Sequence, residues 1–406
     1  MKENKKNKRW CYPRHGIVRN ILFAILSPVA RIKYGVRIER FKEQGDRQYL
    51  ILFNHQTAFD QFFVGMCFRG PVYYVASEDL FSNGLVSSII RYLVAPIPIK
   101  KQTTDVHAVI NCMRVANEGG TIALAPEGNR TYSGKTEYMN PSISMLVRKL
   151  KLPIAFVRIE GGYGVQPRWS DVTRKGKMRT YVSRVIEPEE YVSLSNDEIY
   201  ALVQKELFVD EARDDRTFLS KKSAEYLERA MYVCPHCGLS EFESHKDVIE
   251  CKKCHVKVRY LASTALEGVD QPFPYPFVSD WYDAQCEFVN DFDTSAHTEE
   301  PLYRDTAQFS EVIVYKTKRV LDKKASIVLY GDRITVNEGS ENAYTFSFAD
   351  VTAVTVLGKN KVNIYHNKQV FQIKGSKRFN ALRYVNLCYR HKNILKGEYD
   401  GSFLGL

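Results

Sequence analysis

Two short polar stretches contain the residue types that could carry out chemistry. The first, Asn54 to Asp60, follows the wholly apolar run of residues 49–53. Such a run is typical of a buried parallel strand, and its carboxyl end would lie at the sheet edge where α/β folds bind substrate. We therefore expect His55 and Asp60 at that edge.

His55 and Asp60 can act together only if the chain turns between them. On a single helix they would point about 140° apart, because successive helical residues are rotated by about 100°. Asn54, Gln56 and Thr57 favour a turn or a helix start here. Asp60 could then accept a ring N–H of His55, so that the other ring nitrogen can act as a general base. The alternative is a histidine at a helix start, with Asp60 as a first-turn charge.

The second polar stretch, Pro126 to Thr131, directly follows another predicted strand and contains Glu127 and Arg130. A third apolar run leads to Lys100. Because the ends of parallel strands meet at one edge of a sheet, these groups would form an anion pocket facing His55. Glu127 and Arg130 could instead form a structural ion pair, and Lys100 could simply be solvated.

Strands and helices alternate along residues 36–210. Helical patterns separate predicted strands at residues 49–53, 71–75, 97–99, 121–125, 153–159 and 178–186. This alternation predicts an α/β domain with a mainly parallel sheet flanked by helices.

The motifs of this region resemble those of the glycerolipid acyltransferases of the lysophosphatidic acid acyltransferase type, often called PlsC-like. The family's motifs match, in order, Asn54, His55 and Asp60, then Pro126, Glu127, Gly128, Asn129 and Arg130, then Leu152, Pro153 and Ile154. The resemblance covers roughly residues 17–210. It departs from the family at Thr57, a hydroxyl that lies one position from the usual one.

The resemblance implies the transfer of an acyl group to a hydroxyl. His55 would take the hydroxyl proton, Asp60 would stabilise the imidazolium, and the alkoxide would attack the thioester of acyl-CoA or acyl-carrier protein. A thiol with a pKa near 8.5 leaves readily, so the reaction needs neither a covalent intermediate nor a catalytic metal.

The resemblance also implies a lysophospholipid acceptor, most simply lysophosphatidic acid, and assigns roles in binding it. Arg130 and Lys100 would bind the acceptor phosphate, Glu127 would order the acceptor or Arg130, and amides at Gly128 and Asn129 would contact anions. The family usually has arginine where Lys100 stands. A lysine can still neutralise phosphate, though without the bidentate fork of arginine.

Two cysteine pairs lie in the C-terminal half. Cys234 and Cys237 are followed, after thirteen intervening residues, by Cys251 and Cys254. This spacing predicts a four-thiolate zinc ribbon over residues 233–260, with a redox dithiol pair as the alternative. Four thiolates leave no open position, so the zinc would be structural and would stabilise a short segment.

The rest of the C-terminal half divides into three predicted parts. Residues 211–232 resemble a charged helical linker, and residues 261–310 an irregular connector. Residues 311–406 alternate as short strands before a final helix expected from Ser376 to about Arg390. This small all-β pattern resembles a pleckstrin-homology (PH) or GRAM-like domain.

Residues 1–35 combine a basic start with an apolar run of about ten residues, interrupted by Arg19 and Pro28. The run is shorter than the roughly 20 residues needed to span a bilayer. No small-x-small site follows that would suggest a cleaved signal peptide. We expect an interfacial helix on an anionic bilayer, with packing against its own domain as the alternative.

The charge distribution and the cysteines limit the classes of binding partner and the cellular compartment that we expect. Residues 1–210 carry 31 Lys+Arg against 20 Asp+Glu, whereas residues 211–406 carry 27 of each. The balanced ribbon half argues against nucleic acid, and the basic excess favours an anionic membrane. Nine cysteines, five of them isolated, favour a reducing compartment, so we expect a peripheral or monotopic protein on the cytoplasmic face. A lipid-binding scaffold without activity is the competing function.

Overall fold

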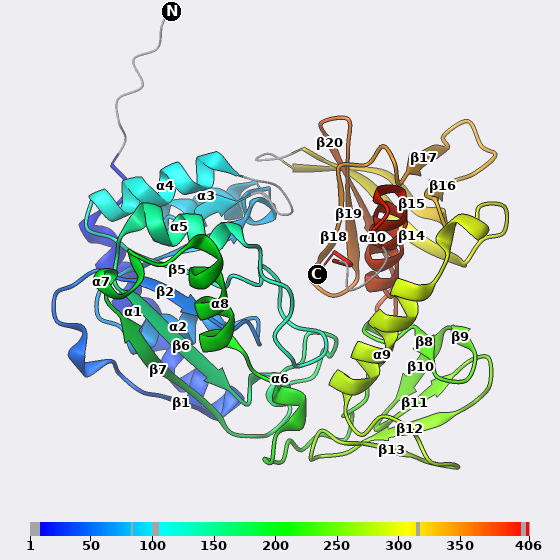
Figure 1. The fold of residues 1–406 in the computed structure, drawn as a ribbon, viewed down its shortest axis with the longest axis horizontal. Helices are drawn as coiled ribbons and strands as arrows, with labels where there is room; N and C mark the ends of the chain where they lie inside the picture. The colour runs from blue at the N-terminus through cyan, green and yellow to red at the C-terminus, as the bar shows by residue number, and fades with distance from the viewer. Residues whose placement is uncertain (1–8, 83, 100–104, 314–316, 399–402, 406) are drawn as a thin grey trace, which may run out of the picture. The chain divides into compact units, whose positions relative to one another are not determined.

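This computed structural model describes residues 9–82, 84–99, 105–313, 317–398 and 403–405. The chain forms two compact units (Figure 1). Unit 1 contains Met1–Arg130, Met139–Glu160 and Lys177–Val209, and unit 2 contains Thr131–Tyr138, Gly161–Gly176 and Asp210–Leu406.

Unit 1 is built on one sheet, which has seven strands in the described residues. They are β1 (Val36–Ile38), β2 (Leu50–Phe53), β3 (Val72–Ser77), β4 (Ile97–Ile99), β5 (Thr121–Leu124), β6 (Ile154–Glu160) and β7 (Met178–Ile186). Their order is β1-β7-β6-β2-β5-β3-β4, and every pair is parallel except β6 with β7. All four residues of β2 are buried, as its apolar sequence requires. The predicted α/β fold class is confirmed.

Helices flank this sheet. They are α1 (Pro13–Tyr34), α2 (Asp60–Cys67), α3 (Leu85–Val94), α4 (Val106–Asn117), α5 (Ser142–Leu150), α7 (Pro188–Tyr191) and α8 (Asn196–Leu207), with short 3-10 turns at Lys42–Gln44 and Glu78–Phe81. Helices α4, α5 and α8 share a hydrophobic core with Leu50 and Leu52 of β2. Successive strand residues point to opposite faces, so this core covers one face of the central strand.

Helix α1 has 22 residues and is longer than the apolar run that the sequence suggested. Arg19 lies inside this helix, as a good helix former can, and its guanidinium donates to the carbonyl of Phe68, just past the end of α2. Pro28 lies inside the helix, which ends at Gly35 in a left-handed conformation. Among the described residues, α1 is long and apolar enough to cross a membrane by length and composition. The interfacial placement stays a prediction.

Unit 2 contains the cysteine-rich segment and a larger β sheet. The first comprises a two-stranded pair, β8 (Val233–Cys234) and β9 (Gly238–Leu239), and an antiparallel sheet of β10 (Phe242–His245), β11 (Val248–Cys251), β12 (Lys257–Tyr260) and β13 (Leu266–Gly268). Each strand is short, so this segment has little apolar core of its own. It shares one hydrophobic cluster with the rest of unit 2.

The larger sheet is antiparallel throughout and precedes a helix. Its described strands are β14 (Tyr303–Ile313), β15 (Thr317–Leu329), β16 (Arg333–Val336), β17 (Tyr344–Ser347), β18 (Ala353–Leu357), β19 (Lys361–His366) and β20 (Gln369–Lys374), in the order β17-β16-β15-β14-β20-β19-β18. Helix α10 (Leu382–Lys396) follows (Figure 1). The predicted all-β domain with a final helix is confirmed, and the PH or GRAM-like resemblance stays a prediction.

Three local predictions were wrong. Residues 211–232 contain two 3-10 turns, Glu211–Arg213 and Leu227–Arg229, in place of a helical linker, because their apolar residues are buried in the shared core. The irregular connector contains a 14-residue helix, α9 (Val278–Asp291), and the first residues of β14. The last helix begins at Leu382 rather than at Ser376. At its actual start, the Asn380 side chain accepts a hydrogen bond from the Arg383 amide.

Candidate active site and metal centre

The structure brings His55 and Asp60 into contact. Strand β2 ends at Phe53, the chain turns, and Asp60 is the first residue of α2. His55 Nδ1 lies 2.8 Å from Asp60 Oδ2. Because a carboxylate only accepts hydrogen bonds, this contact assigns the hydrogen to Nδ1 and makes Nε2 the ring atom that can take up a proton. The His55 side chain is 25% exposed, whereas that of Asp60 is fully buried.

Asp60 is held by the turn that precedes it. Its carboxylate accepts from the Gln56 amide at 2.6 Å, the Thr57 amide at 2.9 Å and the Thr57 hydroxyl at 2.6 Å. These bonds satisfy a buried carboxylate and fix its orientation toward His55. From the sequence, Thr57 was expected to favour the turn and was noted as a displaced hydroxyl, but its bond to Asp60 was not predicted. The available signal was a threonine three residues before an aspartate, because short hydroxyl side chains form local hydrogen bonds of this kind in turns.

The ends of two neighbouring strands hold the backbone of this turn. Glu127, just after β5, is buried, and its Oε1 accepts from the His55 amide at 2.9 Å. The Asn54 side chain accepts from the Ile159 amide at 2.8 Å and donates to the Ile159 carbonyl at 2.9 Å, which ties the turn to β6. Glu127 therefore positions the His55 backbone, a contact that was not predicted from the sequence. Asn54 was predicted as a turn residue and as part of the first family motif, but its bonds to Ile159 were not predicted.

Three other predicted binding residues, Gly128, Asn129 and Arg130, directly follow Glu127 in the chain. Gly128 has a φ of 65°, a left-handed conformation that favours glycine, and its amide donates to the Ala125 carbonyl at 3.0 Å. Asn129 is buried and Arg130 is partly buried in the same turn. The structure thus places Glu127 in contact with the His55 turn, and Gly128, Asn129 and Arg130 follow it directly in the chain. Lys100 lies outside the described residues.

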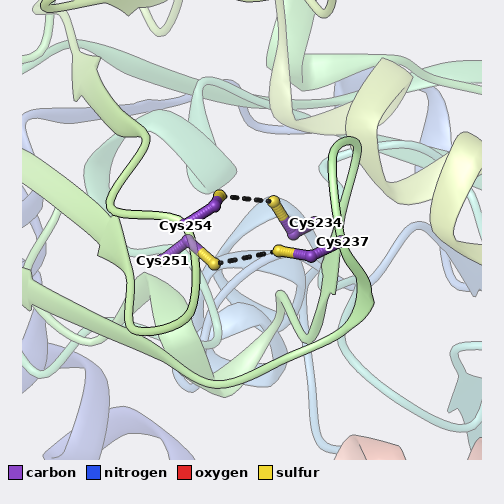
Figure 2. Close-up of side chains that lie close together, drawn as sticks. All are labelled: Cys234, Cys237, Cys251 and Cys254. Carbon is purple, nitrogen blue, oxygen red and sulfur yellow. Dashed lines mark hydrogen bonds between the residues drawn. The ribbon is translucent and has the colours of Figure 1, made fainter.

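The four predicted metal ligands converge in unit 2. The Sγ atoms of Cys234, Cys237, Cys251 and Cys254 all lie within 4.8 Å of one another. Figure 2 shows two of these pairs, Cys234 with Cys254 and Cys237 with Cys251; the sulfurs of each pair are 3.6 Å apart. Disulfide sulfurs would be about 2.05 Å apart, whereas tetrahedral bonds of about 2.3 Å to one zinc ion separate sulfurs by about 3.8 Å. The four residues therefore fit one metal ion better than two disulfides.

The local backbone explains this convergence. Each Cys-x-x-Cys pair forms a tight turn, closed by a residue with positive φ directly after its second cysteine: Gly238 at 67° and His255 at 62°. Burial raises the pKa of Cys251, but hydrogen bonds from the Ser240 hydroxyl and the turn amides outweigh it and lower the pKa to about 6. A thiolate, the form that binds metal, is thus favoured at Cys251.

The described residues form an α/β domain in which the buried carboxylate of Asp60 accepts from Nδ1 of His55, so that Nε2 is able to act as a general base. Residues 34–160 match the model of the acyltransferase family and include both His55 and Arg130. This part of the chain is therefore an acyltransferase-family domain. No curated protein matches the chain.

One similar solved structure is the crystal structure of the 1-acyl-sn-glycerophosphate (LPA) acyltransferase PlsC from Thermotoga maritima. It is 22% identical, with a TM-score of 0.38, over 47% of this chain and 74% of that chain.

The metal centre gives a first prediction. Purified protein should contain about one zinc ion per chain, and Cys254→Ser should lower both the zinc content and the unfolding temperature, because metal binding supplies folding free energy. Elemental mass spectrometry and calorimetry would measure these two quantities. His245→Ala is the matched control, since this exposed residue of β10 lies outside both cysteine turns. A metal-free wild type with two disulfides would contradict the prediction.

Proposed function

We propose that this protein transfers a fatty acyl group from a thioester donor, acyl-CoA or acyl-carrier protein, to the hydroxyl of a lysophospholipid. Lysophosphatidic acid is the expected acceptor, and the product would be a phospholipid. The observation that carries the proposal is the contact between His55 and Asp60 inside an acyltransferase-family domain.

The proposed reaction is one nucleophilic displacement. Nε2 of His55 takes the proton of the acceptor hydroxyl while the hydroxyl oxygen attacks the thioester carbonyl. The carbon–sulfur bond then breaks, and the thiolate takes the proton from the imidazolium, which leaves an ester and a free thiol. Asp60 stabilises the imidazolium between these steps through Nδ1. Because a thiolate is a good leaving group, no acyl-enzyme is needed.

The acceptor phosphate would bind beside this base. Arg130 offers a planar guanidinium that can donate two parallel hydrogen bonds to phosphate oxygens. Lys100 is the second cation that we assign to the phosphate. Glu127 is assigned to positioning, because its carboxylate already accepts from the His55 amide.

The outward face of unit 1 supports a lipid-bound setting. Ile17, Ile21, Ile25 and Ile32 of α1 are 56–86% exposed and recur at spacings that place them on one side of the helix. Helix α3 packs beside α1 and exposes further apolar residues, among them Leu85 at 77%. A soluble surface rarely exposes so contiguous an apolar patch, which suits the headgroup and acyl boundary of a bilayer.

Basic residues accompany this face. Arg14, Arg31 and Lys33 lie on α1, and the basic excess of residues 1–210 has the sign that anionic lipid attracts.

The catalytic proposal predicts the behaviour of His55→Ala. This variant should lose acyl transfer by about 10³-fold or more in kcat, since removing the base leaves only binding and electrostatic contributions. The assay follows labelled acyl-CoA and acyl-carrier protein with a panel of lysophospholipids. His107→Ala, an exposed residue of α4, is the control and should keep wild-type turnover. A His55→Ala protein with even half the wild-type turnover would exclude His55 as the base.

The membrane proposal predicts the behaviour of a double variant on α1. Ile21→Glu with Ile25→Glu should weaken binding to anionic vesicles at least about tenfold, because two exposed apolar side chains lose favourable burial in lipid. Vesicle co-sedimentation at fixed ionic strength measures this. Leu395→Glu, equally exposed on α10 in unit 2, should bind as the wild type does. Unchanged binding by the double variant would show that α1 does not enter the bilayer interface.

A further inference from the structure

Two stretches that belong to unit 2 lie, along the sequence, between the segments that make up unit 1. Thr131–Tyr138 and Gly161–Gly176 belong to unit 2, although the chain before and after each belongs to unit 1. In the sequence, each stretch begins a few residues after one that hydrogen-bonds to the His55 turn, Glu127 in one case and Ile159 in the other. Thr131 follows Arg130, and Gly161 comes two residues after Ile159. The peptide chain therefore connects unit 2 to both of these segments within a few bonds.

The first stretch is fixed from its first residue. Glu137 accepts from the Thr131 hydroxyl at 3.1 Å and from the Ser133 hydroxyl at 3.0 Å. The Gly134 carbonyl accepts from the Glu211 amide at 2.9 Å, which ties the loop to the C-terminal half of the chain. Thr131 and Ser133 are both buried. The loop after Arg130 thus has a single, well-bonded path.

The second stretch closes around one aromatic ring. Phe218 is 1% exposed, and a Cβ added at Gly164 or at Gly176 would lie 2.3 Å from its ring. The ring therefore fills space that these two glycines leave open, and a side chain at either position would displace it.

An ion pair fixes the same stretch. The buried guanidinium of Arg229 donates to the two carboxylate oxygens of Asp171 at 2.9 and 3.0 Å and to the Trp169 carbonyl at 2.8 Å. The Arg229 and Lys359 side chains both hydrogen-bond Asp171 and lower its pKa, against the opposing effect of burial. The second stretch is therefore hydrogen-bonded through Asp171 to Arg229 and to Lys359, which lie in two other segments of unit 2.

In unit 1, the His55 turn depends on the residues just before these stretches. The Glu127 carboxylate accepts from the His55 amide, and Ile159 exchanges two hydrogen bonds with Asn54. A shift of either segment would change the position of the His55 backbone. Misplacing a reacting group by about 1 Å can cost on the order of 10²-fold in rate.

We propose that unit 2 is a positioning scaffold for the His55 centre, that it acts through the two inserted stretches, and that Phe218 is a positioning residue. The inference rests on the proposed acyl transfer for its kinetic test. Order in the inserted stretches keeps Glu127 and Ile159 in place, and these in turn fix the backbone on either side of His55. The effect is carried by the continuous chain.

The experiment compares Phe218→Ala with Phe218→Leu, which keeps most of the apolar volume, and with the neighbouring Leu219→Ala, whose side chain is 58% exposed. Hydrogen exchange followed by mass spectrometry reports the amides of His55 and Ile159 in the full chain. Phe218→Ala should exchange faster at both amides and lose at least about tenfold in kcat, with a smaller change in KM for acyl-CoA. Phe218→Leu should recover most of both, and Leu219→Ala should match the wild type.

Two outcomes would overturn the proposal. One is faster exchange across residues 161–176 while the His55 and Ile159 amides keep their protection and kcat is unchanged. The other is an equal loss in Leu219→Ala. If Phe218→Ala does not fold, Phe218→Leu carries the test through a smaller change of the same sign at both amides. If the wild type transfers no acyl group, the proposed function fails, while the exchange result still decides the scaffold proposal.

Discussion

The hydrogen bond between His55 and Asp60 is the constraint on which the rest of the site depends. It forms because β2 ends at Phe53 and the chain turns before α2 begins at Asp60, so residues that a continuous helix would point apart come within 2.8 Å. The carboxylate can be buried there only because the turn amides and the Thr57 hydroxyl satisfy it. The neighbouring strands β5 and β6 hold the backbone of that turn.

The contact between His55 and Asp60 belongs to unit 1, which supplies the sheet edge and the residues that hold the turn. Two stretches of unit 2 continue directly from those residues along the chain. Segments that are consecutive in the sequence therefore belong to different compact units. The short ribbon strands share the core of unit 2, and a metal held by four thiolates would add folding free energy where little apolar surface is available.

Local signals made part of this structure predictable. Buried strands followed by polar residues predicted the α/β sheet, and the spacing of the cysteines anticipated their convergence. The contact between Glu127 and the His55 amide could not be predicted, because it depends on β2 and β5 being neighbours, which periodicity does not determine. Helix α9 was missed because its buried positions mix aromatic residues with the polar Gln285. Thr57 was expected to favour the turn, but its hydrogen bond to Asp60 was not predicted, because it depends on the path of the turn.

Replacing Asp60 by asparagine tests whether Asp60 orients His55 for proton transfer. The amide is nearly isosteric but can donate a hydrogen to Nδ1, which would favour the wrong tautomer of the ring. In steady-state acyl transfer from acyl-CoA to lysophosphatidic acid, we expect Asp60→Asn to lose about 10³- to 10⁴-fold in kcat, with KM for acyl-CoA close to the wild-type value. A kcat within about threefold of the wild type would contradict this expectation, because such a change, under about 1 kcal/mol, leaves no role for the pair.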